Sequence, residues 1–473
     1  MAALPRDGAS VAGAVPAGIE RGAAPPWLPI AREQAERLAA ICHELIVGLL
    51  MALILVLPMA RARWTRSALL VAAAILWGAR WFLGARPAWR RTGLEWPVAA
   101  FAVWAFLSAA TSLRPLYSLE KFAQEPLTYF GLFLLVLVHV RSERDHRRIL
   151  GSLGVGAAII AAYGLWEWSR PWHPSGTYIR SFTAGGTYIG AYLAAVIPVA
   201  AAQTAVGSRP RRAWWWLVTG LALLCVVPTQ SRAAWAGAAI ALVFLAAVAV
   251  RSLWVPLAAV AAAAPFLFGP EVVPRFLALA SPGHVLADVS AMDRIPVWLY
   301  ALRRMADHPI LGFGFGRQIP GLVVGEGYRS GELVVQGGRL GYAHNTFLDV
   351  GLQMGMVGLA LLVWLLGAVL VALWRAWRAA PPGSPRMVAA GVLAMALAFP
   401  VRAMTNNYYA DDPVILFWFL VALALAGAAP ARASAVPGSG FMVPGRDTAK
   451  PATGAAPPET RNAGRETPEG SAG

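Results

Sequence analysis

Apolar stretches about as long as a membrane helix recur along most of this chain, and short polar segments separate them. A helix needs about 20 predominantly apolar residues to cross the hydrocarbon core of a bilayer. Only residues 270–343 form a long polar interval between such stretches. The pattern predicts an all-α integral membrane protein with about twelve transmembrane helices and one long segment before span ten. The predicted spans lie near residues 39–60, 67–84, 94–113, 124–140, 149–168, 186–206, 213–229, 233–250, 253–269, 345–374, 386–404 and 413–429.

These spans divide the chain into five parts. Residues 39–269 hold spans one to nine, and residues 344–429 hold spans ten to twelve, with residues 270–343 between them. The flanking tails, residues 1–38 and 430–473, are rich in Ala, Pro, Gly and Ser, so we expect them to be disordered. No internal repeat is visible, so the sequence gives no support to an inverted-repeat transporter.

The distribution of positive charge predicts the side of the membrane that each loop faces, because cytoplasmic loops carry an excess of Lys and Arg. With a cytoplasmic N-terminus, the inner loops hold fourteen basic residues and the short outer loops hold eight, although the first outer loop runs against the trend. Both tails are thus predicted to be cytoplasmic, and residues 270–343 to be periplasmic in a cell with two membranes. The inner residues are Arg86, Arg90, Arg91, Arg141, Arg144, Arg147, Arg148, Arg209, Arg211, Arg212, Arg251, Arg375, Arg378 and Arg386. The outer residues are Arg61, Arg63, Arg66, Arg114, Lys121, Arg170, Arg180 and Arg232.

The long outer segment has a helical pattern of its own. Asp293 can cap a helix that runs to about Asp307, and Pro309 ends it. Its apolar residues repeat at helical spacing, which predicts an amphipathic helix lying on the membrane or on the helix bundle. The Gly-Phe-Gly-Phe-Gly run at residues 312–316 predicts a tight hydrophobic turn, with a backbone anion nest as the alternative. The predicted apolar face comprises Ile295, Trp298, Leu299, Leu302 and Met305.

Composition agrees with a membrane protein and narrows the chemistry. The chain has 473 residues, of which 58% are hydrophobic and 14% charged, with a mean hydropathy of +0.57. Its formal charge of +16 comes almost wholly from arginine, since Lys121 and Lys450 are the only lysines. Codon bias explains most of that total, so only the positions of individual arginines are informative. Cys42 and Cys225 lie far apart in apolar runs and indicate neither a disulfide nor a thiolate metal site.

The unusual polar residues converge on the predicted outer face. His344 heads span ten, followed by Asn345 and, five residues on from His344, by Asp349. Arg232 lies in the short turn between spans seven and eight, and Arg180 lies in the loop between spans five and six. Each residue also has a structural interpretation, because histidines at a membrane edge are often structural and arginines there reach toward lipid headgroups. Asp349 is not on the same helical face as His344, so it would orient another group or satisfy a buried neighbour.

Arg294, at the start of the predicted amphipathic helix, completes this set. A positive charge at a helix start opposes the helix dipole, which favours a role in binding. Together, Arg180, Arg232 and Arg294 suit a diphosphate leaving group, because guanidinium groups neutralise phosphate oxygens in a two-point manner. His344 can accept a proton from an attacking hydroxyl near neutral pH. Arg402, at the outer end of span eleven, is a further candidate because a charge buried in the membrane is usually functional.

Four short blocks of these residues resemble the bacterial superfamily of O-antigen ligases, O-antigen polymerases and protein O-oligosaccharyltransferases. The resemblance covers roughly residues 120–430, and its last two blocks are the specific ones. The blocks are the Arg180 loop, the Ser231-Arg232 turn, Arg294 through His308-Pro309-Ile310-Leu311-Gly312-Phe313-Gly314, and His344-Asn345-Thr346-Phe347-Leu348.

The resemblance implies a helical fold of the GT-C kind and a metal-independent, inverting glycan transfer from an undecaprenyl-diphosphate donor, without a cofactor. It implies that Arg232 and Arg294 hold the diphosphate, that Arg180 is a secondary donor contact, and that His344 activates the acceptor hydroxyl. Asn345, Asp349 and Arg402 are candidates for supporting roles, and no residues are assigned to a metal. Nucleic acid is not expected as a partner, and the oligomeric state is left open.

The leading interpretation is an O-antigen ligase in the bacterial inner membrane, with its site facing the periplasm. It would transfer the glycan to a sugar hydroxyl of the lipid A core in lipopolysaccharide biosynthesis. A polymerase or a protein transferase of the same superfamily would keep the chemistry and change the acceptor. The compact outer segment of 74 residues favours the ligase, because it offers no large domain to hold a folded protein. A lipid-linked oligosaccharide flippase is the alternative from another class, but it would need access from both faces.

Overall fold

The chain is described from a computed structural model. The structure describes residues 32–59, 62–85, 90–170, 179–183, 186–267, 292–334, 341–405 and 412–428. The predicted disordered tails therefore fall almost wholly outside the described residues, as do residues 270–291 and 335–340 of the predicted periplasmic segment. The first helix begins at Arg32, within the predicted N-terminal tail.

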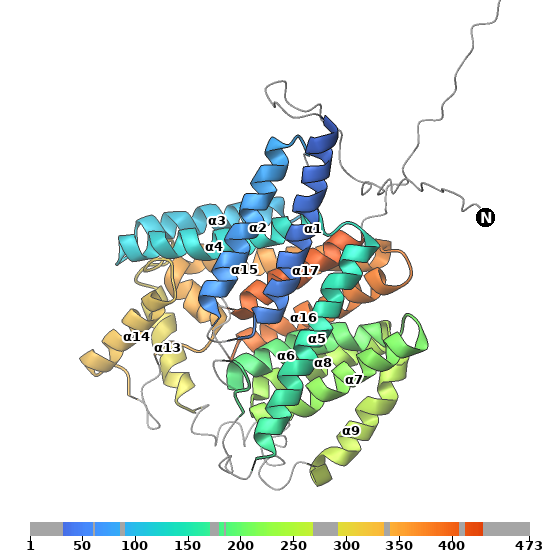
Figure 1. The fold of residues 1–473 in the computed structure, drawn as a ribbon. Helices are drawn as coiled ribbons and strands as arrows, with labels where there is room; N and C mark the ends of the chain where they lie inside the picture. The colour runs from blue at the N-terminus through green and yellow to red at the C-terminus, as the bar shows by residue number, and fades with distance from the viewer. Residues whose placement is uncertain are drawn as a thin grey trace, which may run out of the picture. The chain divides into compact units, whose positions relative to one another are not determined.

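The described residues form helices joined by short turns, with no strand among them (Figure 1). Each predicted span overlaps one α-helix, because a segment that is apolar on all sides can satisfy its backbone groups in lipid only within itself. The helices that match the predicted spans are α1 (Arg32–Val56), α2 (Arg63–Phe82), α3 (Glu95–Ala110), α4 (Pro115–His139), α5 (Glu143–Trp168), α6 (Gly186–Gln203), α7 (Arg209–Val226), α8 (Arg232–Val248), α9 (Trp254–Leu267), α15 (Thr346–Ala379), α16 (Ser384–Ala403) and α17 (Asp412–Ala428).

Several of these helices have the length and composition needed to cross a membrane. Six meet both requirements among the described residues, namely α1, α4, α5, α7, α15 and α16. The helices α3, α6, α8 and α17 are apolar but only 10–17 residues long over their apolar part, which corresponds to roughly 15–26 Å of rise. The chain is thus an all-helical, multi-pass membrane protein, and a crossing by each of the twelve helices stays a prediction.

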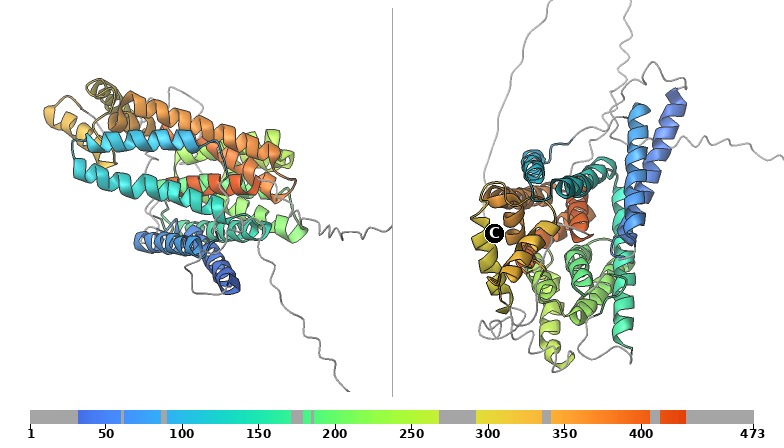
Figure 2. Two further views of the ribbon diagram at one scale, coloured as in Figure 1. Left: turned by 90° about the horizontal axis from the view of Figure 1, so that it is seen from above. Right: turned by 90° about the vertical axis from the view of Figure 1, so that its left-hand side faces the viewer.

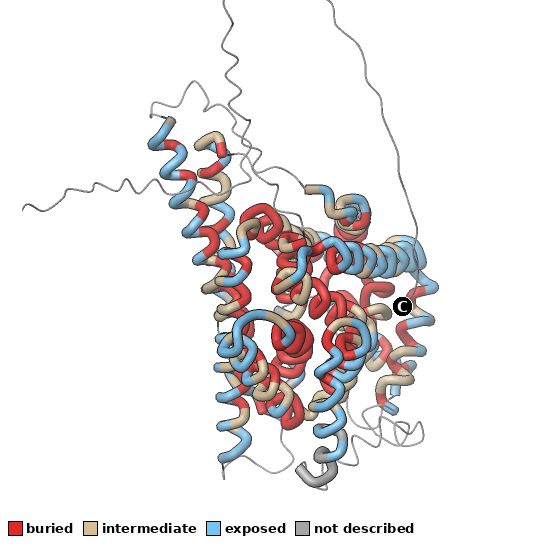
Figure 3. Tube along the Cα trace, turned by 90° about the vertical axis from the view of Figure 1, so that its right-hand side faces the viewer, coloured by how far each residue is buried: buried red, intermediate tan, exposed pale blue. Residues whose placement is uncertain are grey.

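The core of the bundle is formed by α6, α16 and α17, whose residues are buried along most of their length. Figure 3 shows the buried segments gathered in the middle of the described helices. Small residues let these helices approach closely, as is usual for helix packing in membranes. A Cβ added at Gly391 of α16 would lie 2.7 Å from the carbonyl oxygen of Pro198 in α6. Likewise, one added at Gly164 of α5 would lie 2.8 Å from Cys225 Sγ in α7, which confirms that this cysteine is a core residue.

The described part of the outer segment holds α13 (Arg294–Met305) and α14 (Gln318–Ser330), which lie beside one end of α15 (Figure 2). The predicted amphipathic helix is confirmed as α13, and Asp293 stands at its N-cap. The prediction that the Asp293 side chain caps it is wrong, since that side chain makes no capping hydrogen bond.

The predicted apolar face of α13 is also wrong in part. Val297, Tyr300 and Ala301 are buried against α14 and α15, whereas Leu299 and Leu302 are 53% and 51% exposed. Of the predicted face, only Met305 is buried. The helix carries apolar residues on more than one side, so its contacts with α14 and α15 decide which side is covered.

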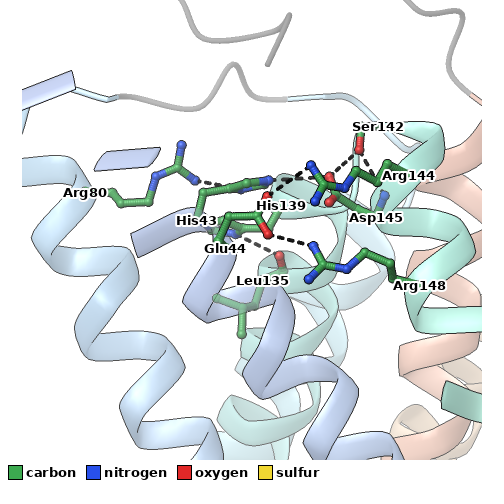
Figure 4. A network of polar contacts seen from close by, with 9 residues as sticks. All are labelled: His43, Glu44, Arg80, Leu135, His139, Ser142, Arg144, Asp145 and Arg148. Carbon is green, nitrogen blue, oxygen red and sulfur yellow. Dashed lines mark hydrogen bonds and ion pairs between the residues drawn. The ribbon is translucent and has the colours of Figure 1, made fainter. Parts of the chain in front are cut away.

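A polar network joins α1, α2, α4 and α5 at their ends on the predicted cytoplasmic side (Figure 4). Its buried members are His43, Arg80, His139 and Asp145. His43 of α1 lies between Asp145 of α5 and Arg80 of α2, with its ring nitrogens 3.4 Å from Asp145 Oδ2 and 3.4 Å from Arg80 Nη1. The ring of His139 in α4 stacks on His43 with centroids 6.0 Å apart, and Glu44 pairs with Arg148 at 2.6 Å. Because charges buried at a helix end are tolerated only with partners, this network fixes how the α1–α2 hairpin packs on the bundle.

Candidate functional site

The head of α15 places His344 in an unusual backbone conformation. Asn345 is the N-cap of the helix, and its Oδ1 accepts hydrogen bonds from the N–H groups of Phe347 and Leu348 at 3.0 and 3.3 Å. Asparagine is favoured at this position because its side chain satisfies N–H groups that lack a partner in the helix. His344 has a φ of 50° and a half-buried side chain. A left-handed conformation costs a residue with a Cβ about 1–2 kcal/mol, so its surroundings must hold it there.

Two side chains fix the backbone on the N-terminal side of His344. Trp298 of α13 donates from Nε1 to the carbonyl oxygen of Ala343 at 2.7 Å. Asp349 of α15 is fully buried and accepts at Oδ1 from the Ala343 N–H at 3.2 Å. Asp349 Oδ2 has no hydrogen-bond partner among the described residues. The expectation that Asp349 satisfies a neighbour rather than pairing with His344 thus agrees with its contacts.

Two arginines place positive charge beside His344. Burial lowers the pKa of His344, and the nearby guanidinium groups of Arg294 and Arg317 lower it further, to about 4. Arg294, at the start of α13, and His344 are therefore close enough to interact electrostatically, as expected from the sequence. Arg180 and Arg232 are not among the charged groups that act on His344. At neutral pH the imidazole is uncharged and can accept a proton.

The sequence reasoning missed Arg317, which follows directly after the glycine-rich turn. Its Nη2 lies 3.4 Å from the hydroxyl of Tyr342, and its guanidinium lies 5.7 Å from the centre of that ring. The Tyr342 ring in turn lies 4.7 Å from the His344 ring at a tilt of 44°. The position next to a predicted turn was the only signal available in the sequence.

The glycine-rich turn at residues 312–316 is used to break α15 rather than to bind an anion. The N–H groups of Phe313 and Gly314 donate to the carbonyl oxygens of Leu352 and Gln353 at 2.8 and 2.9 Å. The Gly316 N–H donates to the Gln353 side chain at 2.7 Å. These bonds occupy the N–H groups that a nest would need, so the tight turn is the interpretation that the structure supports.

Gly355 is the residue at which α15 is interrupted, with a φ of 69° and a ψ of −172°. A Cβ there would lie 2.2 Å from the carbonyl oxygen of Ile310, so only glycine fits between the turn and the helix. The Met356 N–H, released from the helix, donates to the Pro309 carbonyl at 2.7 Å. The first turns of α15, which carry His344 and Asp349, are in this way attached to the outer segment.

A second group of candidate residues lies in two adjoining turns. The Ile179 N–H donates to the Pro228 carbonyl at 3.3 Å, which joins the Arg180 loop to the turn before α8. Glu167 of α5 accepts from the backbone N–H groups of Arg180 and Ser181, at 2.7 Å from the latter. The side chain of Arg180 is exposed.

Arg232 opens α8 in this second group. Its neighbour Ser231 caps the helix by accepting from the Ala234 N–H at 3.4 Å. A Cβ added at Gly190 of α6 would meet Ser231 Cβ at 3.1 Å, so the turn lies directly against α6. Arg232 itself is half-buried. The structure thus brings Arg180 and Arg232 into neighbouring turns, and their predicted convergence with His344 on one diphosphate stays a prediction.

Arg402 is buried near the end of α16, with 3% of its surface exposed. Its Nη2 donates to the carbonyl oxygen of Ala191 in α6 at 3.0 Å. A Cβ at Gly237 of α8 would lie 2.4 Å from Arg402 Cδ, so the side chain crosses α8 where that helix lacks a side chain. Next to it, Ala191 and Ala403 pack with Phe347 of α15. Arg402 therefore lies among the helices that carry the two groups of candidate residues.

Backbone strain is found at the same turns. Among the described residues other than glycine, those with positive φ are Ser181, Gln230 and His344, at 52°, 52° and 50°. Ser181 follows Arg180, and Gln230 precedes the Ser231 cap of α8. Residues held in this region often mark functional sites, because the surrounding structure must be built to keep them there.

One comparison with known proteins bears on the family. Residues 217–363 match the model of a protein family described as O-antigen ligase. This segment is thus similar to the O-antigen ligase and polymerase superfamily. The predicted resemblance is therefore confirmed. The ligase-family segment runs from α7 into α15 and contains Arg232, Arg294, Arg317, Asn345, His344 and Asp349, whereas Arg180 and Arg402 lie outside it.

Other comparisons add little to this assignment. No curated protein matches the chain. One similar structure is a chain solved in work on structural coordination of polymerization and crosslinking by a peptidoglycan synthase complex. The similarity covers 72% of the present chain and 97% of that chain. The two are 18% identical with a TM-score of 0.40, which is too distant to bear on function.

Proposed function

We propose that this chain is an O-antigen ligase of the bacterial inner membrane. It transfers a glycan from undecaprenyl diphosphate to a sugar hydroxyl of the lipid A core, at the periplasmic face and without a metal or other cofactor. The observation that carries the proposal is a histidine held in a strained conformation at a helix head within the matched segment. Burial and two nearby guanidinium groups lower its pKa.

The proposed reaction is a single displacement at the anomeric carbon of the donor. The acceptor oxygen forms a bond to this carbon as the bond to the diphosphate oxygen breaks, and His344 accepts the hydroxyl proton. One displacement inverts the configuration. The diphosphate leaves with the bonding electron pair, and Arg294 and Arg232 stabilise the negative charge that develops on it. Arg180 is a secondary contact to the donor.

The electrostatics of the site support a donor that carries negative charge. Two guanidinium groups next to His344 are unfavourable for a protonated imidazole and favourable for a bound diphosphate. A diphosphate bound at Arg294 would offset the charge of that guanidinium and raise the pKa of His344. The base would then be strengthened only when the donor is in place.

An apolar cavity beside the head of α15 suits the lipid part of this donor. The cavity holds about 80 Å³ and is lined by Thr346 and Val350 of α15, Tyr129 of α4, Phe399 of α16 and Trp418 of α17. One of its lining residues, Thr346, is two positions after His344 in the sequence. We propose that it takes the isoprenoid nearest the diphosphate, while the rest of the chain lies in the bilayer.

The test is reconstitution of the purified protein with an undecaprenyl-diphosphate-linked glycan, deep-rough lipopolysaccharide and a chelator. We expect glycan to appear on the lipopolysaccharide. Longer lipid-linked chains alone would make the protein a polymerase, and transfer to a pilin-like protein would make it a protein transferase. Movement of the donor across the bilayer without any transfer would replace the proposal with a flippase.

The His344→Ala variant separates catalysis from folding. It should insert into the membrane at the level of the original protein and show no transfer, because the acceptor hydroxyl has lost its base. Arg303→Gln is a suitable control, since Arg303 is exposed on α13 and its side chain makes no hydrogen bond or ion pair within the described residues. Full transfer by His344→Ala would remove His344 from the mechanism.

A further inference from the structure

Arg317 is the second cation beside His344, and nothing in the reaction proposed above assigns it a task. It lies between the glycine-rich turn and α14, and it contacts the hydroxyl and the face of Tyr342. Tyr342 in turn contacts the His344 ring, with the ring centroids 4.7 Å apart at a tilt of 44°. The three side chains therefore form a chain of contacts that runs from Arg317 through Tyr342 to His344.

Tyr342 contacts the imidazole ring itself, whereas the other restraints act on the residues on either side of His344. Trp298 and Asp349 hold the backbone at Ala343, and Asn345 holds the start of α15. None of these contacts touches the imidazole ring. A ring at the end of a half-exposed side chain needs its own contact to keep one orientation, and Tyr342 supplies that contact.

We propose that Arg317 is a positioning residue for His344, acting through Tyr342 on the orientation of the imidazole and through its charge on the basicity of the imidazole. It holds Tyr342 by a hydrogen bond and by stacking on its ring, which a planar guanidinium can do at once and an ammonium cannot. The inference rests on the proposed function only where it concerns the rate of transfer.

The positive charge of Arg317 also acts on the pKa of His344. The charged and titratable groups that face His344 are Arg294 from α13, Arg317, Tyr342 from the same loop, and the Asp349 carboxylate, which bonds to the neighbouring Ala343 N–H. Removing the positive charge of Arg317 makes protonation of His344 easier, so the pKa of His344 rises. Replacing Arg317 by lysine keeps the charge but loses the planar contact with Tyr342.

The experiment reads His344 directly, so that it does not depend on finding the substrate. Purified full-length protein in nanodiscs is treated with diethyl pyrocarbonate, which modifies only uncharged imidazole, and the modification rate of the His344 peptide is followed by mass spectrometry against pH. With Arg317→Gln we expect the midpoint for His344 to rise by about one pH unit. With Arg317→Lys and with the control Arg303→Gln it should stay at the original value.

Transfer assays then test the orientation. Arg317→Lys and Tyr342→Ala should each reduce kcat about tenfold, with little change in the KM for the donor, because a misaligned base slows proton transfer without weakening binding. An unchanged His344 midpoint in Arg317→Gln, or full kcat in Arg317→Lys, would overturn the inference. If the original protein transfers glycan to no acceptor but its His344 midpoint still depends on Arg317, the proposed function fails and this inference stands.

Discussion

The hydrogen bond between Asp349 and Ala343 leads to a prediction whose size can be worked from the structure. Asp349 is fully buried, and its Oδ1 is 3.2 Å from the Ala343 N–H. Replacing Asp349 by alanine leaves this N–H without an acceptor in a buried position, which costs about 1–3 kcal/mol. The neighbouring His344 is held at positive φ, so the released backbone gains by relaxing to an ordinary conformation.

If that free energy is needed to keep His344 in its active position, it appears as a loss of rate. At about 1.4 kcal/mol for each factor of ten, Asp349→Ala should reduce kcat roughly five- to 150-fold. The KM for the donor should change little, because the Asp349 side chain is buried and accepts its hydrogen bond from the backbone N–H of Ala343. Initial rates of glycan transfer in proteoliposomes, at several donor concentrations, give both constants.

Asp349→Asn is the matched variant that isolates the cause. The amide oxygen can still accept from Ala343, and the amide nitrogen takes the place of Oδ2, which has no hydrogen-bond partner among the described residues. This variant should keep most of the rate. An equal loss in the asparagine and alanine variants would show that the carboxylate charge matters instead of the hydrogen bond. A normal rate in Asp349→Ala would refute the idea that this bond positions His344.

Three further predictions follow from the same geometry. Arg232→Lys should lower transfer at least tenfold if Arg232 binds the diphosphate at two points, and near-normal turnover would reduce it to a point charge. The pKa of His344 is about 4 in the free protein. The value of kcat/KM for the donor should therefore stay constant down to about pH 5 and fall at lower pH, because the imidazole becomes protonated there. A fall centred near pH 6.5 would contradict the assignment of His344 as the base. Gly355→Ala should lower the thermal unfolding temperature and the activity together, because its Cβ would lie 2.2 Å from the Ile310 oxygen at a φ of 69°. Gly367→Ala in the same helix, where a Cβ meets nothing within 4 Å, is the control that should be neutral or stabilising.

The break in α15 shows where prediction from the chain ends. Apolar composition predicts a helix after His344, and α15 does run from Thr346 to Ala379. The interruption at Gly355 depends on residues 309–314, some forty positions earlier, whose backbone groups bond to residues 352–356. In the sequence, residues 312–316 look like a turn, and the glycines of α15 look like a surface for helix packing. Only the contact between these two segments interrupts α15 at Gly355.

The sequence by itself predicted the helices, the resemblance to a family and most of the candidate residues, because these depend on local properties. Hydrophobic length predicts membrane helices, and short motifs such as His344-Asn345 carry both a helix cap and a reactive group. The tertiary structure decided which charges lie beside His344, which face of α13 is buried, and how Asp349 is used. These depend on contacts between residues distant in the chain, as between Arg317 and Tyr342, and no local pattern specifies the partner in such a contact.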